Sequence, residues 1–266
     1  MSDLSDAGTV GLERALEALE TEATALLSVV SSVARVARKA KAAAETGSVR
    51  DIPQALDVAA QLAADVAAAA ERLKAGWHFD VEDWFASGEY TKELLVSAAE
   101  AGVKAFESDD RILCFPVIVQ VSPSDVSVVI DKKKDRRIRP SVVAARLGRL
   151  QQGEPKFKPE AFIESLAVAY DLVIASKSMR PGAPVKLVDI HGVLTIMPGT
   201  AREYTRPEFA RDIYLLDQSG IVKTRRGRRM SLPASSLTRS GGVLRTVTRN
   251  GQAKDYAGIC FEEVGK

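Results

Sequence analysis

The sequence predicts an α+β protein that is mostly helical, with an N-terminal antiparallel helical hairpin or bundle followed by a mixed domain that carries extra β-hairpins. Apolar residues repeat at heptad spacing near the N-terminus, and two β-branched runs flank a turn further on. The two parts of the sequence also differ in charge: residues 1–110 carry 20 acidic and 10 basic side chains, whereas residues 111–266 carry 15 acidic and 27 basic side chains. We therefore expect an acidic helical or coiled-coil domain at 1–108 and a basic α+β domain at 109–266.

Composition places the chain among globular proteins. Of its 266 residues, 46% are hydrophobic and 27% are charged, which does not favour disorder. No apolar run approaches the roughly 18–20 residues of a membrane span, and the acidic, polar N-terminus does not have the pattern of a secretory signal. The two cysteines, Cys114 and Cys260, are too few for a disulfide framework. We expect a cytoplasmic protein with no membrane partner.

Two stretches near the N-terminus have the heptad spacing of long helices. From residue 12 to residue 37, apolar side chains alternate at intervals of four and three. This first seam contains Leu12, Leu16, Leu19, Leu26, Val30 and Val33. The second seam contains Ile52, Leu56, Ala59, Ala63, Val66, Ala70, Leu73 and Trp77. The short connection between them predicts an antiparallel hairpin, and a third helix is expected over 89–106.

The first seam has two interpretations, because a heptad pattern does not distinguish a partner in the same chain from one in another chain. It forms either a coiled-coil arm that dimerises or binds another protein, or the core of a self-contained three-helix bundle. In both cases we expect the aromatic residues before the third helix to close the end of the bundle. These are Trp77, Phe79, Trp84 and Phe85.

The clearest β pattern lies at 112–131, where two apolar, β-branched runs flank a Ser-Pro-Ser-Asp turn. We expect a hairpin there, with an edge or a bulge at Pro116. Six cations follow within eight positions, before a helix that begins near Pro140: Lys132, Lys133, Lys134, Arg136, Arg137 and Arg139. This cluster either neutralises phosphates or is a solvated loop at a sheet edge. A second basic cluster in the same half favours phosphate contact.

The C-terminal half contains a series of predicted helices. Amphipathic patterns predict helices over 158–177 and 189–197, with a short strand at 185–187 between them. Thr205 and Glu208 form a capping-box pattern that opens a third helix. The order of these elements is therefore helix, strand, helix, helix.

The third helix ends at Gly220, and strands at 221–222 and 230–232 flank a basic turn. Three helices followed by a hairpin in this order resemble the winged helix-turn-helix superfamily, over about residues 158–233. The resemblance implies nucleic-acid binding, in which the third helix reads the major groove and the hairpin, or wing, contacts the backbone or minor groove. The wing cations are Lys223, Arg225, Arg226, Arg228 and Arg229.

The helix that begins at Thr205 is a poor candidate for base reading. Its cations Arg206 and Arg211 are offset by three acids: Glu208, Asp212 and Asp217. Either the wing dominates and binding is largely independent of sequence, or the module contacts protein. A last hairpin, with a turn at Asn250-Gly251, is expected to pair with 112–131 or to extend the wing.

The sequence contains no recognisable catalytic motif. Its two histidines are far apart, and there is no phosphate-binding glycine loop, G-x-S-x-G elbow or C-x-x-C pair. We expect no catalytic residue, cofactor or metal, and we expect His191 to be a packed or surface side chain. A metal-dependent nuclease built from Asp125, Asp131 and Glu164, or from Asp131 and Lys133, is the least favoured alternative.

Two functions follow from these patterns. The first is a nucleic-acid-binding protein, with duplex DNA as the first candidate and weak sequence specificity, whose N-terminal helices oligomerise or bind a protein partner. The second is a non-catalytic scaffold subunit of a larger complex, such as a chromosome-organising or phage-defence machine. In the first function the two basic clusters bind phosphates, and in the second the helices and the winged helix are docking surfaces.

Overall fold

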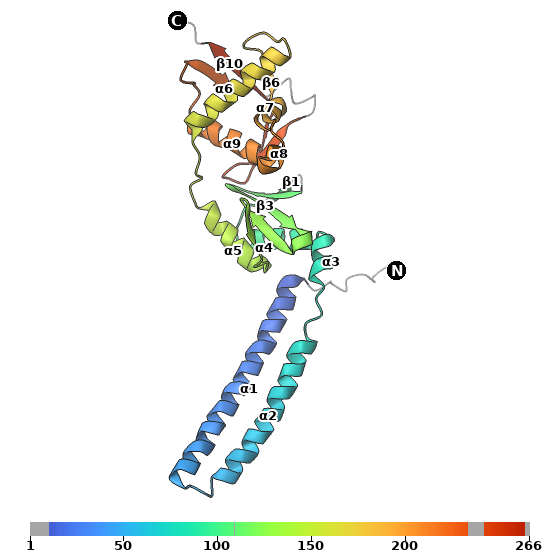
Figure 1. The fold of residues 1–266 in the computed structure, drawn as a ribbon, viewed down its shortest axis with the longest axis vertical. Helices are drawn as coiled ribbons and strands as arrows, with labels where there is room; N and C mark the ends of the chain where they lie inside the picture. Colours follow the sequence, from blue (N-terminus) through green and yellow to red (C-terminus); the bar gives the residue numbers. More distant parts are fainter. Residues whose placement is uncertain (1–10, 109, 234–241, 264–266) are drawn as a thin grey trace, which may run out of the picture. The chain divides into compact units, whose positions relative to one another are not determined.

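The computed structural model describes residues 11–108, 110–233 and 242–263 (Figure 1). Helices come first along the chain, and small antiparallel sheets alternate with further helices after them. The protein is therefore α+β and mostly helical, as the sequence predicts. No helix in the described ranges is long and apolar enough to cross a bilayer.

The chain divides into two compact units. One contains the chain up to Glu93 together with Arg139–Ser141, and the other contains Leu94–Ile138 and the chain from Val142 onward. The expected domain boundary at residue 108 lies inside the second unit.

Helices α1 (Leu12–Thr46) and α2 (Ile52–Ala75) form the antiparallel hairpin that the heptads predict (Figure 1). Gly47, which ends α1, has a φ of +73°, a conformation that glycine adopts without strain. Within the described residues these two helices pack extensively only against each other. A three-helix bundle therefore does not form, and the predicted third helix, α4 (Glu89–Glu100), is shorter than expected.

The prediction of which α1 residues face inward is partly confirmed. Its N-terminal members lie on the more buried side of α1: Leu12, Leu16, Leu19 and Leu26. After Leu26 the buried row continues through Val29, Val33 and Val36, so Val30 lies outside the seam and is exposed. The reason is geometric, because a straight helix with 3.6 residues per turn drifts away from a strict heptad over several turns.

In α2 every second residue of the predicted seam, which is expected to face α1, is exposed instead. The exposed members are Leu56, Ala63 and Ala70. The inward positions in their place are Ala55, Leu62 and Ala69, while Ile52, Ala59, Val66 and Leu73 face inward as predicted. Alanine occupies so many positions of α2 that intervals of three and of four both land on apolar residues. Periodicity alone therefore does not choose the face.

Aromatic residues form a small core around the short helix α3 (Val81–Ala86). Trp84 and Phe85 are buried, and Phe85 stacks on Tyr90 with ring centroids 4.0 Å apart. Trp77 lies beyond the end of α2 and is exposed. The expected aromatic cluster is thus centred on α3, and Trp77 is not buried in it.

A five-stranded antiparallel sheet lies in the second unit, with its strands in chain order. They are β1 (Phe106–Ser108), β2 (Arg111–Cys114), β3 (Val117–Ser122), β4 (Ser127–Ile130) and β5 (Lys133–Asp135). The expected hairpin at 112–131 corresponds to the β3–β4 pair, in which Val119 lies opposite Ile130. Pro116 lies between β2 and β3, so it separates two strands instead of bulging one.

The remaining elements are α5 (Pro140–Gln151), α6 (Pro159–Ser176), β6 (Val185–Lys186), α7 (Leu187–Leu194), α8 (Thr200–Glu203), α9 (Arg206–Ser219), β7 (Arg228–Ser231), β8 (Leu244–Val247), β9 (Ala253–Tyr256) and β10 (Gly258–Glu263). Helices α6 and α9 and the capping box of Thr205 and Glu208 agree with prediction. The predicted helix at 189–197 begins and ends earlier, as α7, and α8 was not predicted. Strand β10 lies between β6 and β7, so it extends the sheet that carries the wing. Strands β8 and β9 pair with each other in a separate sheet.

One hydrophobic core unites most of these elements. Helix α6 contributes Leu166 and Tyr170, and helix α9 contributes Phe209 and Ile213. Cys260, from β10, belongs to this core as expected. Strand β10 thus joins the core to the sheet that carries the wing.

Candidate nucleic-acid interface

The hairpin predicted as the wing spans 222–230. Its first arm forms only an isolated bridge between Lys223 and Arg229, so the strand predicted at 221–222 does not form, and the second arm is β7. The Met230 amide donates to the Val222 carbonyl at 2.8 Å, and the Thr224 amide donates to the Arg228 carbonyl at 3.0 Å. Gly227, in the turn, has a φ of +83°, where a side chain would be strained. Because β7 also pairs with β10, the wing is held by the sheet behind it.

Four of the five wing cations are exposed, and in the part of the chain that the structure describes their side chains make no ion pair or hydrogen bond. These are Lys223, Arg225, Arg226 and Arg229. Acids are close to them: the Arg225 amide donates to Glu164, and Arg229 lies opposite Glu262 across the β7–β10 pair. Neither contact uses a cationic group, so all four charges stay available for charge-assisted bonds to phosphate oxygens.

Arg228, the fifth wing cation, has a structural role. Its guanidinium donates to both carboxylate oxygens of Asp171, at 2.6 and 3.0 Å, and lies 5.5 Å from the centroid of the Phe261 ring. The bond to Asp171 raises the pKa of Arg228. A bidentate pair over an aromatic ring fixes this side chain to α6 and β10. The sequence prediction that Arg228 contacts phosphate therefore has to compete with an existing partner.

Most cations of the 132–139 cluster are already paired. Their partners are Glu208 for Lys132 (3.4 Å), Asp125 for Lys134 (2.7 Å), Asp135 for Arg137 (2.9 Å), and Glu13 and Glu20 for Arg139 (2.7 and 2.6 Å). Arg139 also belongs to the first unit, whereas the other five cations of the cluster belong to the second. Among the described residues only Lys133 and Arg136 are left without an ion pair or side-chain hydrogen bond. The cluster thus offers far less free charge than its sequence indicates.

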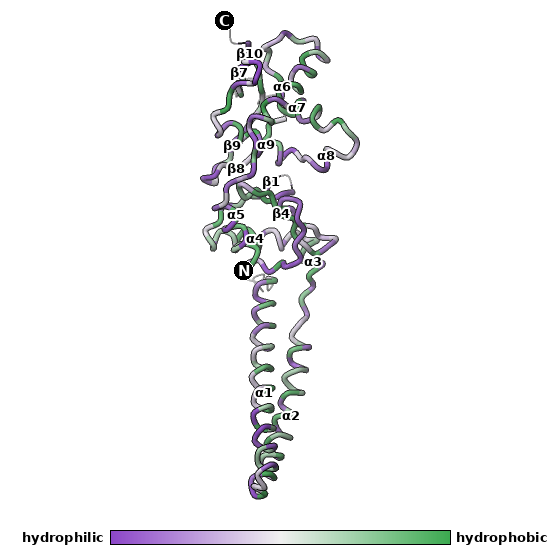
Figure 2. Tube along the Cα trace, turned by 60° about the vertical axis from the view of Figure 1, so that its left-hand side comes forward, coloured by the Kyte–Doolittle hydropathy of each residue, from purple (hydrophilic) through white to green (hydrophobic). Residues whose placement is uncertain are grey.

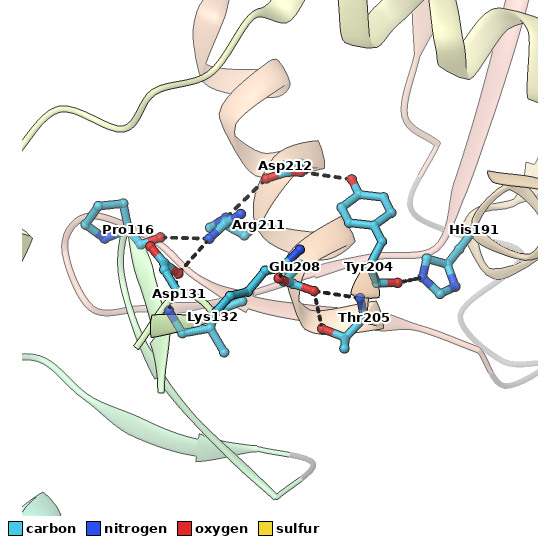
Figure 3. A network of polar contacts seen from close by, with 10 residues as sticks. Pro116, Asp131, Lys132, His191, Tyr204, Thr205, Glu208, Arg211 and Asp212 are labelled. Carbon is cyan, nitrogen blue, oxygen red and sulfur yellow. Dashed lines mark hydrogen bonds and ion pairs between the residues drawn. The ribbon is translucent and has the colours of Figure 1, made fainter. Parts of the chain in front are cut away.

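Helix α9 does not present a free outer face. Arg211 donates to the Asp131 carboxylate at 3.1 Å and to the Pro116 carbonyl at 3.4 Å, which joins the helix to the β2–β3 and β4–β5 turns (Figure 3). Further along, Asp217 accepts bonds from Lys254 and Tyr256 of β9, at 2.6 and 2.8 Å. A helix covered in this way cannot enter a major groove without losing these contacts.

A polar network continues from Arg211 toward α7 (Figure 3). Arg211 bonds Asp212 at 3.1 Å, and the Tyr204 hydroxyl donates to Asp212 at 2.9 Å. Burial raises the pKa of Tyr204, and the Asp212 carboxylate raises it further. His191, which is buried, bonds the Tyr204 carbonyl through Nε2 at 2.8 Å. These groups satisfy one another, so the network holds α9 in place and His191 is a packed side chain as expected.

A cleft beside this network was not indicated by the sequence. It lies between the five-stranded sheet and the start of α9, and its charged lining residues are Arg111, Asp131, Lys132, Arg202, Glu203 and Glu208. Three cations and three acids balance each other, so the cleft has no preference for an anion. Only contacts across the fold create it, and no local motif could have identified it.

Each acidic residue of the hypothetical nuclease site already has a partner in the same chain. Asp125 binds Lys134, Asp131 binds Arg211, and Glu164 accepts from the Arg225 amide. Within the described ranges no group of three or more His, Cys, Asp or Glu side chains is placed to hold a metal ion. Comparison of the chain with protein-family models, with curated proteins and with solved structures finds no match.

Proposed function

We propose that the protein binds nucleic-acid duplexes, with DNA as the first candidate, through a winged-helix module whose wing contacts the phosphate backbone. The observation that supports this is a set of four exposed cations on one short hairpin, none of which pairs with a side chain that the structure describes: Lys223, Arg225, Arg226 and Arg229. Exposed Arg and Lys side chains bind phosphates by releasing condensed counterions, whatever the base sequence. The N-terminal hairpin is the oligomerisation or partner-binding arm.

Binding of this kind is weakly sequence-specific. Helix α9, the element that would read bases, is tied to Asp131 and to β9 by its own charged residues. Contacts to the backbone position a protein on a duplex but carry no sequence information. Two duplexes of equal length and unrelated sequence should therefore bind with similar affinity.

The test compares two variants of equal net charge. The wing variant replaces Lys223, Arg225, Arg226 and Arg229 by Ala, and the control variant replaces four exposed cations elsewhere: Arg50, Lys74, Arg149 and Arg180. Fluorescence anisotropy at low salt should show about 100-fold weaker duplex binding for the wing variant, since four phosphate contacts of roughly 0.7 kcal/mol each are lost. Equal affinities of the two variants would contradict the proposal.

A second function, that of a scaffold subunit, is favoured by a specific observation. Most of the 132–139 cations pair with carboxylates of the same chain, and α9 is covered, so a smaller basic surface remains than the sequence indicates. The helical hairpin, by contrast, exposes large apolar side chains. Absence of duplex binding even at low salt, together with a partner protein that co-purifies at fixed stoichiometry, would support this second function.

A further inference from the structure

The helical hairpin exposes an apolar side. Three large apolar side chains on it are open to solvent, with exposed fractions of 65% for Leu27, 43% for Val30 and 56% for Leu56. Each of them follows an inward-facing residue by one position along its helix. In Figure 2 hydrophobic and hydrophilic residues alternate along both helices.

These residues lie on the same side of the hairpin. A step of one residue turns a side chain by about 100° around the helix axis. Because α1 and α2 run in opposite directions, the same step carries the side chains of both helices toward the same side. The row on α1 is Leu27, Val30, Ala34 and Ala37, and the row on α2 is Leu56, Ala60, Ala63, Ala67 and Ala70. We call these two rows, which contain no charged residue, the apolar side.

The opposite side of the hairpin carries charged residues. One position before the inward-facing residues lie five of them, Glu22, Arg35, Lys39, Asp65 and Arg72, together with one exposed large apolar residue, Val58. Glu22 of α1 and Arg72 of α2 approach to 4.0 Å there. This contact supports the geometry, because equal steps from the inward rows of the two helices do meet on one side. The apolar side is therefore a distinct surface and not an average property of the hairpin.

Among the residues that the structure describes, no second layer packs extensively on the hairpin. Within α1 and α2 only Leu12, Ala43 and Ala69 are buried. Helices with an apolar face are stable when another layer covers that face. The alanine-rich rows would also let two helix backbones approach closely.

The charges along α1 indicate what that second layer is. Residues 12–29 contain four acidic residues and one basic residue, a net charge of −3, and residues 30–46 contain four basic residues and one acidic residue, a net charge of +3. Glu20 and Lys41 stand at the two ends of the α1 row, about equally far from Val30. Glu20 contacts Arg139, but 66% of its side chain is exposed, so it can accept a second cation. A two-fold axis near Val30 would place each acidic half beside a basic half.

We propose that the protein dimerises through the apolar sides of two hairpins, which form an antiparallel four-helix bundle with α1 of one copy against α1 of the other. This inference rests on the arm that belongs to the proposed function, and it names the partner as a second copy of this chain. Val30 lies near the two-fold axis, and Leu27 and Leu56 are buried in the interface. Glu20 of one copy lies beside Lys41 of the other.

Cysteine cross-linking tests this arrangement. Val30→Cys should form a disulfide-linked dimer, of twice 28.6 kDa, under mild oxidation. Ser28→Cys, which is exposed on the charged side of the same helix, is the matched control and should stay monomeric on a denaturing gel. The native cysteines, Cys114 and Cys260, are buried and give little background. Equal cross-linking of the two variants would overturn the proposal.

Charge reversal tests the antiparallel direction. Arg38→Glu with Lys41→Glu should weaken the dimer at least ten-fold in sedimentation equilibrium, because like charges then meet at both ends of the interface. Arg35→Glu with Lys39→Glu, on the charged side, makes the same change in net charge and should leave the dimer unchanged. A stronger dimer for the first variant would indicate parallel helices, and a monomeric wild type at tens of micromolar would exclude the dimer.

The dimer and the duplex binding can fail separately. Leu27→Glu with Leu56→Glu changes only exposed positions and should give a monomer with unchanged far-UV circular dichroism. That monomer should still bind a duplex through its wing, with an affinity lowered only by the loss of the second wing. The wing variant should show the reverse behaviour: it should lose duplex binding and remain a dimer.

Discussion

At the scale of single residues, one carboxylate organises the start of α1. Glu93 accepts from the Leu12 amide at 3.0 Å, from the Glu13 amide at 2.9 Å and from the Trp84 indole at 2.8 Å. The cap residue itself is Gly11, and a Cβ there would collide with the Glu93 carboxylate. The side chain that caps the helix thus comes from a residue about 80 positions away, which the local sequence does not reveal.

Glu93→Ala should lower the stability of the first unit by about 1–2 kcal/mol, the usual cost of a lost helix cap. It also leaves the Trp84 indole N–H without its acceptor. Urea denaturation followed at 222 nm measures the change. Gly11→Ala should have an effect of the same sign, and Glu89→Ala, on the same helix but pairing only with exposed Lys92, should have little effect.

Asp135 provides a pH-dependent contact. Hydrogen bonds from the side chain and amide of Arg137, with the nearby Arg146 charge, hold the pKa of Asp135 at about 2. A carboxyl group whose pKa is lower in the folded state stabilises the fold above its unfolded pKa, near 3.9. This stabilisation is therefore lost as the pH falls from about 4 to about 2.

Asp135→Asn should remove that part of the pH dependence. The measurement is the unfolding midpoint of wild type and variant at several pH values between 2 and 6. The two curves should converge at the acid end and separate above pH 4. A constant difference across the whole range would show that ionisation of Asp135 does not matter. Asp57→Asn, at an exposed position of α2, is the control.

At the scale of elements, the wing contains two kinds of arginine. Arg228→Ala should lower the free energy of unfolding by about 1–2 kcal/mol, because it removes a bidentate pair with Asp171 and a contact with Phe261. Arg226→Ala should leave stability unchanged and weaken duplex binding several-fold. Thermal unfolding and anisotropy on both variants separate the two roles. If Arg226→Ala were the destabilising change, the assignment would be reversed.

The elements also show what the sequence could predict. Heptad spacing identified both helices of the hairpin, and the capping box identified the start of α9. The inward face of α2 could not be predicted, because alanine at Ala55, Ala59 and Ala63 makes two registers equally apolar. A sequence pattern shows which residues are apolar, but the register of the two helices depends on how their backbones pack.

The candidate site was harder to predict than the fold, for a related reason. Basic residues are visible in a sequence, but their partners are not. Arg139 binds Glu13, 126 positions away, and Arg211 binds Asp131, 80 positions away. Such pairs depend on tertiary structure, so the 132–139 cluster looks like a phosphate site in the sequence while most of its charges are internally neutralised. Four of the five wing cations differ, because no acidic side chain in the described part of the chain pairs with them, whereas Arg228 pairs with Asp171.

At the scale of the whole molecule, the net charge of +2 gives no indication of nucleic-acid binding. The relevant quantity is local, because four free cations gathered on one hairpin can release counterions even from a nearly neutral protein. In a dimer two such wings would act together, which raises the apparent affinity for a long duplex without any new contact.

The most direct test of phosphate binding by the wing is the salt dependence of duplex binding by the wild type and the wing variant. For each cation that contacts a phosphate, the slope of log K against log salt is about −0.9. The loss of Lys223, Arg225, Arg226 and Arg229 should therefore make the slope shallower by about 3–4 on a single-site duplex. A wing variant with the wild-type slope would show that the wing does not bind phosphates and would contradict the proposed function.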